Sequence, residues 1–345
     1  MSDIFPVSFF LGLFFIYLNK LLSLQGIKNI RPTPQTLHHK STSRFGGIAI
    51  YLSLFLVSFY SDNEDYAFLS TLLLCSVPMM VVGLLDDFNL EIQPRIRMLT
   101  SVPTALMCYF LLGTQAYSLE IPYLDFLFDS WVFSLVFISF ALVGVANAFN
   151  IIDGINGQVL IYSATVCVCV LFFTDLQKTT DIYLTLVSVF FAILGILVLN
   201  FPFGKIFIGD GGAYILGIIV SVVLIKIYQI NELSPWYVML VLIYPVTEII
   251  SSIFRRIIEK FSTTSPDNNH LHHLIYKRIS KIGIDSERVK HFLVSLLIFF
   301  IYLPFILGAN YFRNETSILV ILTLFFAAFY FIMYLLLSPK NFRIK

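Results

Sequence analysis

Long apolar runs alternate with short polar segments along most of the chain. A membrane hydrocarbon core about 30 Å thick requires about 20 predominantly apolar residues per helix, because lipid offers no partner for unpaired backbone groups. Length and apolarity select eleven such runs, at residues 4–24, 46–61, 66–85, 98–117, 130–147, 158–173, 182–201, 213–230, 235–254, 291–312 and 317–337. The pattern therefore predicts an all-α, polytopic membrane helix bundle of about eleven transmembrane helices.

The composition supports this interpretation. Of the 345 residues, 58% are hydrophobic and 12% are charged, whereas soluble proteins average about 45–50% apolar and about 25% charged residues. A net charge of +1 predicts no nucleic-acid partner. The first run lacks a small-residue cleavage site and is interpreted as a retained helix. All four cysteines lie in apolar runs, which favours packed thiols over a metal site. We expect one integral membrane domain, 1–345.

The basic residues predict the orientation of the chain. If the loop after the first run is cytoplasmic, every Lys and Arg falls at the cytoplasmic side except Lys178 and Arg313, which are outside, and Lys226, which lies within a run. This is the positive-inside pattern of membrane proteins. An odd number of spans then places the N-terminus outside and the C-terminus in the cytoplasm.

Polar motifs concentrate on the predicted cytoplasmic side. They occupy five loops, at residues 25–45, 86–97, 147–157, 202–212 and 255–290, and include "HHKSTSRFGG", "LLDDF", "NAFNIIDGING", "IGDGG" and "SPDNNHLHH". Because five such loops share one face, we expect them to form a single active site. Within the runs, Lys226 and Glu248 are the only ionisable residues well inside, and such residues are functional candidates.

Two adjacent carboxylates, Asp86 and Asp87, follow the third apolar run. They oppose the helix dipole there, at a cost of about 0.3–1 kcal/mol each. Neighbouring carboxylates also repel, which favours a cation beside them. We interpret the pair as Mg²⁺ ligands or as a base and a ligand; the alternative is a solvated helix end.

Asp210 lies in a glycine-rich turn that opens the eighth run. One interpretation is a helix N-cap, a position at which Asp is common. The other is a phosphate site, in which the backbone N–H groups around Gly211 approach phosphate while Asp210 holds the metal. Lys205 precedes this turn as a candidate phosphate contact. Lys40 and Arg44 offer similar contacts before the second run, although orientation alone also explains them.

Three histidines, His270, His272 and His273, begin a segment with apolar residues at helical spacing. The spacing predicts a short amphipathic helix on the membrane surface. On a continuous helix His270 and His273 share a face and His272 points away, which favours contact with an anion over a zinc site. A polar interfacial face without further function is the alternative.

The motifs, taken in this order over about residues 28–278, resemble the polyprenyl-phosphate N-acetylhexosamine-1-phosphate transferase family. This is glycosyltransferase family 4, and the WecA-type branch is more similar than the related phospho-MurNAc-pentapeptide translocase. The resemblance implies that the lipid phosphate of undecaprenyl phosphate attacks the sugar-linked phosphorus of a UDP-N-acetylhexosamine. Polyprenyl-diphosphate sugar and UMP would result. It further implies Mg²⁺, with Mn²⁺ as a substitute, an inner (cytoplasmic) membrane enzyme with a cytoplasmic active site, and a homodimer.

The resemblance also implies roles for single residues. Asp86 and Asp87 would organise or deprotonate the lipid phosphate, and Asp87 and Asp210 would ligate the metal. The three histidines would contact the diphosphate or the sugar. By the same resemblance, Asn150 and Asp153 would contribute to the nucleotide and metal pocket, and Lys40 and Arg44 match the basic loop. Asn147, Lys205 and Gly211 are further candidates for substrate binding. Asn156 stands where relatives often have Asp and receives no catalytic role.

Two other functions compete with this one. An intramembrane prenyltransferase is suggested by "DDFNLE", but it would need a second aspartate-rich cluster, and Asp153 and Asp210 stand singly. A secondary transporter would place polar groups at mid-membrane, where few occur. The sequence leaves open which N-acetyl sugar is used. It also leaves open whether the product feeds lipopolysaccharide O-antigen, capsule, teichoic acid or glycoprotein assembly.

Overall fold

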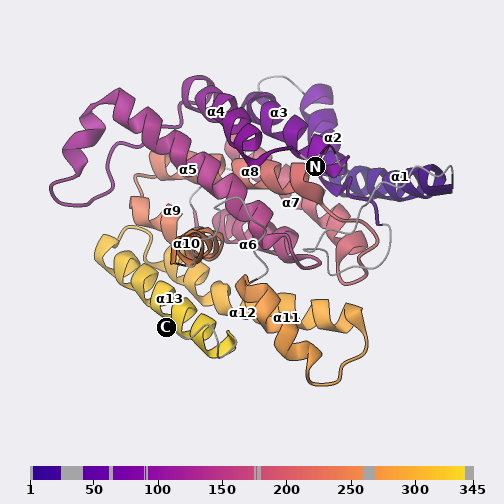
Figure 1. Cartoon of the computed structure of the whole chain (residues 1–345). Coiled ribbons are helices and arrows are strands. Elements are labelled where there is room, and N and C mark those ends of the chain that lie inside the picture. The colour runs from indigo at the N-terminus through magenta and orange to yellow at the C-terminus, as the bar shows by residue number, and fades with distance from the viewer. Residues whose placement is uncertain are drawn as a thin grey trace.

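The computed structural model describes residues 3–24, 42–61, 65–88, 90, 92–174, 176, 180–258 and 269–338 (Figure 1). The helices are α1 (Ile4–Leu24), α2 (Gly46–Tyr60), α3 (Ala67–Asp87), α4 (Pro94–Leu111), α5 (Trp131–Ile152), α6 (Gln158–Phe173), α7 (Asp181–Asn200), α8 (Gly209–Ile230), α9 (Pro235–Val241), α10 (Ile243–Ile258), α11 (Leu271–Ser280), α12 (Glu287–Tyr311) and α13 (Thr316–Leu337), with a 3₁₀ turn η1 (Asp125–Asp129). Over the described ranges, β structure is limited to one isolated bridge between Ser43 and Ile206. The predicted all-α class is confirmed.

Seven of the described helices are long and apolar enough to cross a membrane, which supports a multi-pass membrane protein. The pair α9 and α10 forms an eighth candidate span that bends by 76°. The predicted number of eleven spans is not confirmed, because α2 and α6 have only 15 and 16 residues. At 1.5 Å per residue, such helices measure roughly 22–24 Å, which is less than the core of a typical bilayer.

Helix α8 lies in the middle of the bundle and contacts α2, α3, α5, α6 and α9 (Figure 1). Nearly all of its side chains are buried. Its first turn is brought close to two neighbours through glycines: a Cβ on Gly47 of α2 would overlap Gly212, and a Cβ on Gly83 of α3 would overlap Gly211. Because glycine has no side chain, these four glycines allow α2 and α3 to pack closely against the N-terminus of α8.

The segments before α2 and α8 pair with each other through their backbones. Phe207 N–H donates to the Ser43 carbonyl at 2.7 Å, and Gly46 N–H donates to the Phe207 carbonyl at 2.9 Å. Gly209, with φ +75°, then turns the chain into α8, and a Cβ there would overlap the Arg44 carbonyl. This pairing holds Arg44 beside the start of α8.

Candidate active site

Asp87, the last residue of α3, stabilises the first turn of α8. Its Oδ1 accepts the backbone N–H of Asp210 at 3.0 Å, and its Oδ2 accepts that of Gly211 at 3.1 Å. The side chain is fully buried, and a negative charge is favourable at a helix N-terminus. Asp210 itself stands inside the first turn, after Ile208 at the N-cap, so the N-cap interpretation of Asp210 is wrong. The N–H of Gly211 is donated to Asp87 and not held free for phosphate.

Two arginines link the carboxylates. Arg44 Nη1 lies 3.7 Å from Asp87 Oδ1, and its Nη2 lies 4.0 Å from Asp210 Oδ1. Arg97 Nη1, near the start of α4, lies 2.9 Å from Asp86 Oδ2 and 3.7 Å from Asp210 Oδ2. Asp210 thus stands between two guanidinium groups, and its side chain keeps 22% of its surface exposed.

The neighbouring groups determine the charge state of both arginines. Burial alone would lower the pKa of Arg44, but the carboxylates around it, foremost Asp210 and Asp87, outweigh burial and raise that pKa. For Arg97, Tyr214 together with Asp86 and Asp210 likewise outweighs burial and raises the pKa. Both guanidinium groups are therefore charged at any physiological pH.

Tyr214, one turn into α8, connects this cluster to α5. Its hydroxyl oxygen accepts hydrogen bonds from Arg97 and, at 3.0 Å, from Asn150 Nδ2. Asn150 therefore joins the cluster through Tyr214, not through a carboxylate.

Asp153 follows α5 and completes the cluster. Burial raises the pKa of its carboxyl well above the usual range; Asp210 and Asp87 raise it further, and Arg44 opposes them. When all groups are ionised, the four carboxylates of Asp86, Asp87, Asp153 and Asp210 exceed the two guanidinium groups by two negative charges. A cation beside these groups would favour their ionised forms, and carboxylate oxygens are the donors that Mg²⁺ prefers.

Among the described residues, no group of three or more His, Cys, Asp or Glu side chains is arranged to hold a metal ion. Mg²⁺ is often bound by only one or two carboxylates together with substrate phosphates. The donor set around Asp210 therefore fits a cation that is completed by a phosphate-bearing substrate.

The three histidine rings gather at the start of α11. Their centroids are 5.5 Å apart for His270 and His272, 5.6 Å for His270 and His273, and 4.2 Å for His272 and His273. The expectation that His272 points away from the other two is wrong. His270 precedes the helix with an extended backbone (φ −64°, ψ 154°), so helical spacing does not apply to it.

The histidine segment packs on the loop that carries Asp153. A Cβ on Gly154 would overlap the His272 ring, so the absence of a side chain at Gly154 is required. His272 is fully buried, and neither ring nitrogen has a hydrogen-bond partner in the described protein. Burial, followed by the neighbouring histidines and Arg255, lowers the pKa of His272 well below its usual range, so this ring is neutral.

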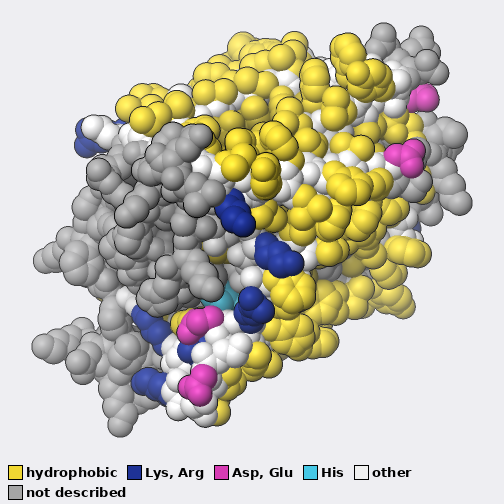
Figure 2. Space-filling view, turned by 90° about the vertical axis from the view of Figure 1, so that its right-hand side faces the viewer, with side chains coloured by type: hydrophobic (Ala, Val, Ile, Leu, Met, Phe, Trp, Pro, Cys, Tyr) yellow, Lys and Arg dark blue, Asp and Glu magenta, His cyan; other side chains and the backbone are white. Residues whose placement is uncertain are grey.

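Two further predicted residues, Asn147 and Lys205, have other partners in the described protein. The Asn147 side-chain amide donates to the Val143 carbonyl at 2.8 Å within α5. Lys205 is exposed, with its Nζ 5.3 Å from the Phe203 ring centroid. Lys40 lies outside the described residues. Figure 2 shows a largely hydrophobic face with a group of basic and acidic side chains and a histidine in its lower left part, and further acidic side chains at its upper right edge.

Two members of the cluster were not predicted, namely Arg97 and Tyr214. Arg97 stands in "IQPRIR" directly before an apolar run, where basic residues are common for orientation alone. Tyr214 stands in an apolar helix, where an aromatic residue is normally part of the core. What marks them as members of the cluster is contact between helices: Arg97 contacts Asp86, and Tyr214 contacts Asn150.

Comparison with known proteins agrees with the family resemblance of the sequence motifs. A family model described as glycosyl transferase family 4 matches residues 69–228, which include the Asp86 and Asp87 pair, Asp153 and Asp210. The chain is 28% identical over 251 residues to undecaprenyl-phosphate alpha-N-acetylglucosaminyl 1-phosphate transferase of Thermotoga maritima, covering 73% of this chain and 74% of that relative.

Two further relatives are similar over slightly longer stretches. The probable undecaprenyl-phosphate N-acetylglucosaminyl 1-phosphate transferase of Bacillus subtilis is 28% identical over 278 residues, covering 79% of this chain and 74% of the relative. The undecaprenyl-phosphate alpha-N-acetylglucosaminyl 1-phosphate transferase of Escherichia coli (strain K12) is 24% identical over 292 residues, covering 80% and 76% respectively.

Proposed function

We propose that the chain belongs to glycosyl transferase family 4, whose model matches residues 69–228, and that it transfers an N-acetylhexosamine 1-phosphate from a UDP-sugar to undecaprenyl phosphate. The products are polyprenyl-diphosphate sugar and UMP. The relatives act, by their names, in N-acetylglucosaminyl 1-phosphate transfer, so UDP-N-acetylglucosamine is the first donor to test. The reaction is the initiating step of cell-surface glycan synthesis.

The observation that carries the proposal is the convergence of Asp86, Asp87 and Asp210 with Arg44 and Arg97 at the N-terminus of α8. Phosphoryl transfer depends mainly on positioning and on stabilising charge over the phosphate oxygens. Two guanidinium groups are suited to contact a diphosphate, since their planar donors match phosphate oxygens. Both are held in place by carboxylates on different helices.

In the proposed reaction, an oxygen of the lipid phosphate attacks the sugar-linked phosphorus, and the bond from that phosphorus to UMP breaks. Arg44 and Arg97 orient the phosphate groups, while Asp86 keeps Arg97 in position at 2.9 Å. Asp153 holds a proton readily, because burial and the neighbouring carboxylates raise its pKa. The histidine segment lies beside it, across Gly154, and would contact the diphosphate or sugar.

Mg²⁺, or Mn²⁺ in its place, belongs to this proposal as the cofactor. Asp210 and Asp87 would hold it, because Asp210 is partly exposed and each Asp87 oxygen keeps a second lone pair after accepting one N–H. When bound, the ion neutralises charge on the diphosphate. The closeness of Asp87 and Asp210, which share Arg44 within 4.0 Å, supports this assignment.

One assay tests the reaction. Purified protein is supplied with undecaprenyl phosphate, Mg²⁺ and a panel of UDP-N-acetyl sugars, and UMP release is measured with and without a chelator. We expect release with at least one sugar, dependent on the lipid phosphate and abolished by the chelator. If no sugar in the panel releases UMP, the proposed reaction is excluded.

The proposal places the site on the cytoplasmic face of the inner membrane. Labelling of Lys205→Cys and Tyr123→Cys with a membrane-impermeant maleimide tests this face, because both positions are exposed and all four native cysteines are buried. We expect Lys205→Cys to react only in inside-out vesicles and Tyr123→Cys only in right-side-out vesicles. The reverse pattern would overturn the orientation.

A further inference from the structure

Glu248, on α10, is fully buried in a helix that is otherwise mostly apolar on its buried side. A buried carboxylate is costly unless several hydrogen bonds compensate for lost water. Glu248 accepts three. They come from His270 Nδ1 at 3.1 Å, from the backbone N–H of Leu271 at 3.0 Å and from the Tyr330 hydroxyl at 2.8 Å.

The bond to Leu271 determines where α11 begins. Leu271 is the first residue of α11, and His270 before it makes no side-chain capping hydrogen bond. The capping acceptor comes instead from α10, because Glu248 Oε1 takes the first N–H of the helix. A carboxylate at this end also complements the helix dipole. Glu248 therefore fixes the start of the histidine segment.

The same oxygen orients the His270 ring. Nδ1 cannot both donate to Glu248 and accept from Arg255 Nη2, which lies 3.4 Å away. The shorter contact is the one with the carboxylate, which only accepts when ionised, so Nδ1 carries the proton. The other ring nitrogen, Nε2, lies on the opposite side of the imidazole and is directed away from Glu248.

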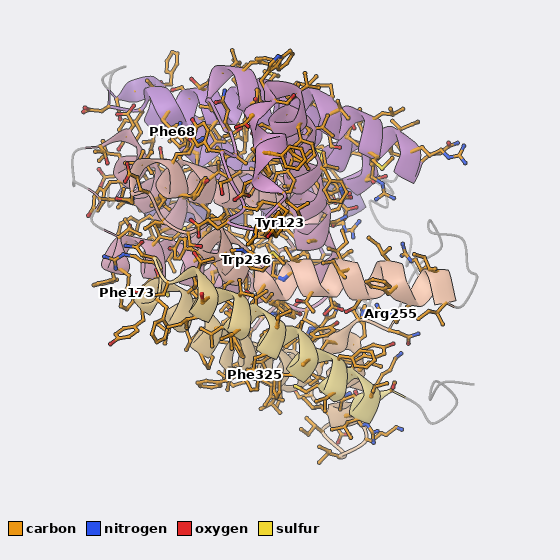
Figure 3. All side chains as sticks on the ribbon, turned by 90° about the vertical axis from the view of Figure 1, so that its left-hand side faces the viewer. Phe68, Tyr123, Phe173, Trp236, Arg255 and Phe325 are labelled. Atoms are coloured by element: carbon orange, nitrogen blue, oxygen red, sulfur yellow. The ribbon has the colours of Figure 1, made fainter. Side chains whose placement is uncertain are left out.

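Tyr330 holds the second carboxylate oxygen and connects Glu248 to α13. Figure 3 shows α10 and α13 inclined to each other, with Arg255 toward the C-terminal end of α10, and the two helices are in contact. Arg255 lies over the Tyr334 ring at 4.9 Å, one helical turn beyond Tyr330. The carboxylate is thus held between α10, α11 and α13 in a single orientation.

We propose that Glu248 is a positioning residue that orients His270 toward the substrate, and that Tyr330 holds the Glu248 carboxylate through its other oxygen. The proposal rests on the proposed transferase function, in which the histidine segment contacts the diphosphate or sugar. Glu248 does not touch substrate, and it acts through the His270 ring and the first turn of α11.

Wild-type protein is assayed first, since UMP release by the wild type establishes the reaction independently of Glu248. Glu248→Gln keeps the size of the side chain and an oxygen that accepts the Leu271 N–H, but removes the charge beside His270. We expect kcat/KM to fall about 10- to 100-fold, as for loss of a hydrogen bond to a charged group. Tyr330→Phe, which removes one hydrogen bond and keeps the ring, is expected to lower it about threefold to tenfold.

Tyr244→Phe is the matched control, because it removes a buried α10 hydroxyl that has no hydrogen-bond partner in the described protein. It should retain wild-type kcat/KM. The deciding measurement repeats Glu248→Gln in a His270→Asn background. If Glu248 acts through His270, the added loss is less than about twofold, since residues acting as a unit are not additive.

Two outcomes overturn the proposal while leaving the transferase function standing. In the first, wild type is active and both Glu248→Gln and Tyr330→Phe match it. In the second, Glu248→Gln costs the same factor with and without His270, which a general effect on folding would produce. If Glu248→Gln does not fold, Tyr330→Phe alone decides: unchanged kcat/KM in this variant overturns the proposal.

Discussion

Asp87 at the end of α3 accepts the backbone N–H of Asp210 in the first turn of α8 at 3.0 Å, while Arg44 lies within 4.0 Å of both side chains. The two aspartates therefore differ in what they do for the fold. One is buried and holds a helix end; the other is partly exposed between two guanidinium groups.

This difference separates the effects of Asp87→Asn and Asp210→Asn. Both should lower UMP release about 100-fold or more, because each removes a charge from the site of phosphoryl transfer. Only Asp87→Asn should destabilise the protein, by about 1–3 kcal/mol, since the amide leaves a buried N–H without its acceptor. Thermal unfolding in detergent measures this. Equal melting temperatures for the two variants would contradict the capping role.

Arg97→Lys tests the bridge between Asp86, Asp210 and Tyr214. Lysine keeps the charge but has no planar fork, so it cannot maintain all three contacts. We expect kcat/KM for UMP release to fall about tenfold or more, as for one lost charge-assisted hydrogen bond. Arg95→Lys on the same helix is the control, because Arg95 is exposed. A similar small effect of both substitutions would argue against a role for Arg97.

Gly154→Ala tests the contact between the Asp153 loop and the histidine segment. The added Cβ would overlap the His272 ring, which is fully buried. We expect a loss of stability of about 1–3 kcal/mol, typical of overpacking, together with reduced UMP release. Gly144→Ala in α5 is the control, since a Cβ there meets no atom within 4 Å. If Gly154→Ala behaves like Gly144→Ala, this packing is not needed.

The buried His272 predicts a pH dependence of stability. In the unfolded chain a histidine takes up a proton near pH 6.5, whereas burial keeps His272 neutral in the folded protein. Below about pH 6.5 the unfolded state therefore binds more protons, and the free energy of unfolding falls by up to about 1.4 kcal/mol per pH unit. The stability difference between wild type and His272→Asn should shrink on acidification. A constant difference from pH 7.5 to 5 would refute this.

The helices were largely predictable from the sequence. The predicted limits of 4–24 and 158–173 coincide with those of α1 and α6, because an apolar run in a membrane protein has almost no alternative to a helix. Less predictable was the ninth run, which breaks near Leu242 into α9 and α10 with a 76° bend. A continuous apolar pattern carries no signal for such a break.

The candidate site was predictable in composition but not in connectivity. Asp86, Asp87, Asp210 and Arg44 stood out because charged residues are rare in this chain, and the structure places them together. Asn147 and Lys205 stood out for the same reason, yet their side chains contact the Val143 carbonyl and the Phe203 ring. A sequence motif shows which groups are present, not which partner each one takes.

The sequence by itself determined that the protein is a membrane-embedded helical bundle, and it showed which polar residues lie between the apolar runs. Both results follow from local hydrophobicity and from the length of each run. Only the tertiary structure decided that Asp87, not Asp210, caps α8, that the histidine rings gather, and that Glu248 serves α11 from α10. The histidine rings gather because His270 stands before α11 and is not helical. The hydrogen-bonded partners are between 22 and 124 positions apart in the chain. Close packing of helices brings them within hydrogen-bond distance, and no local pattern encodes that approach.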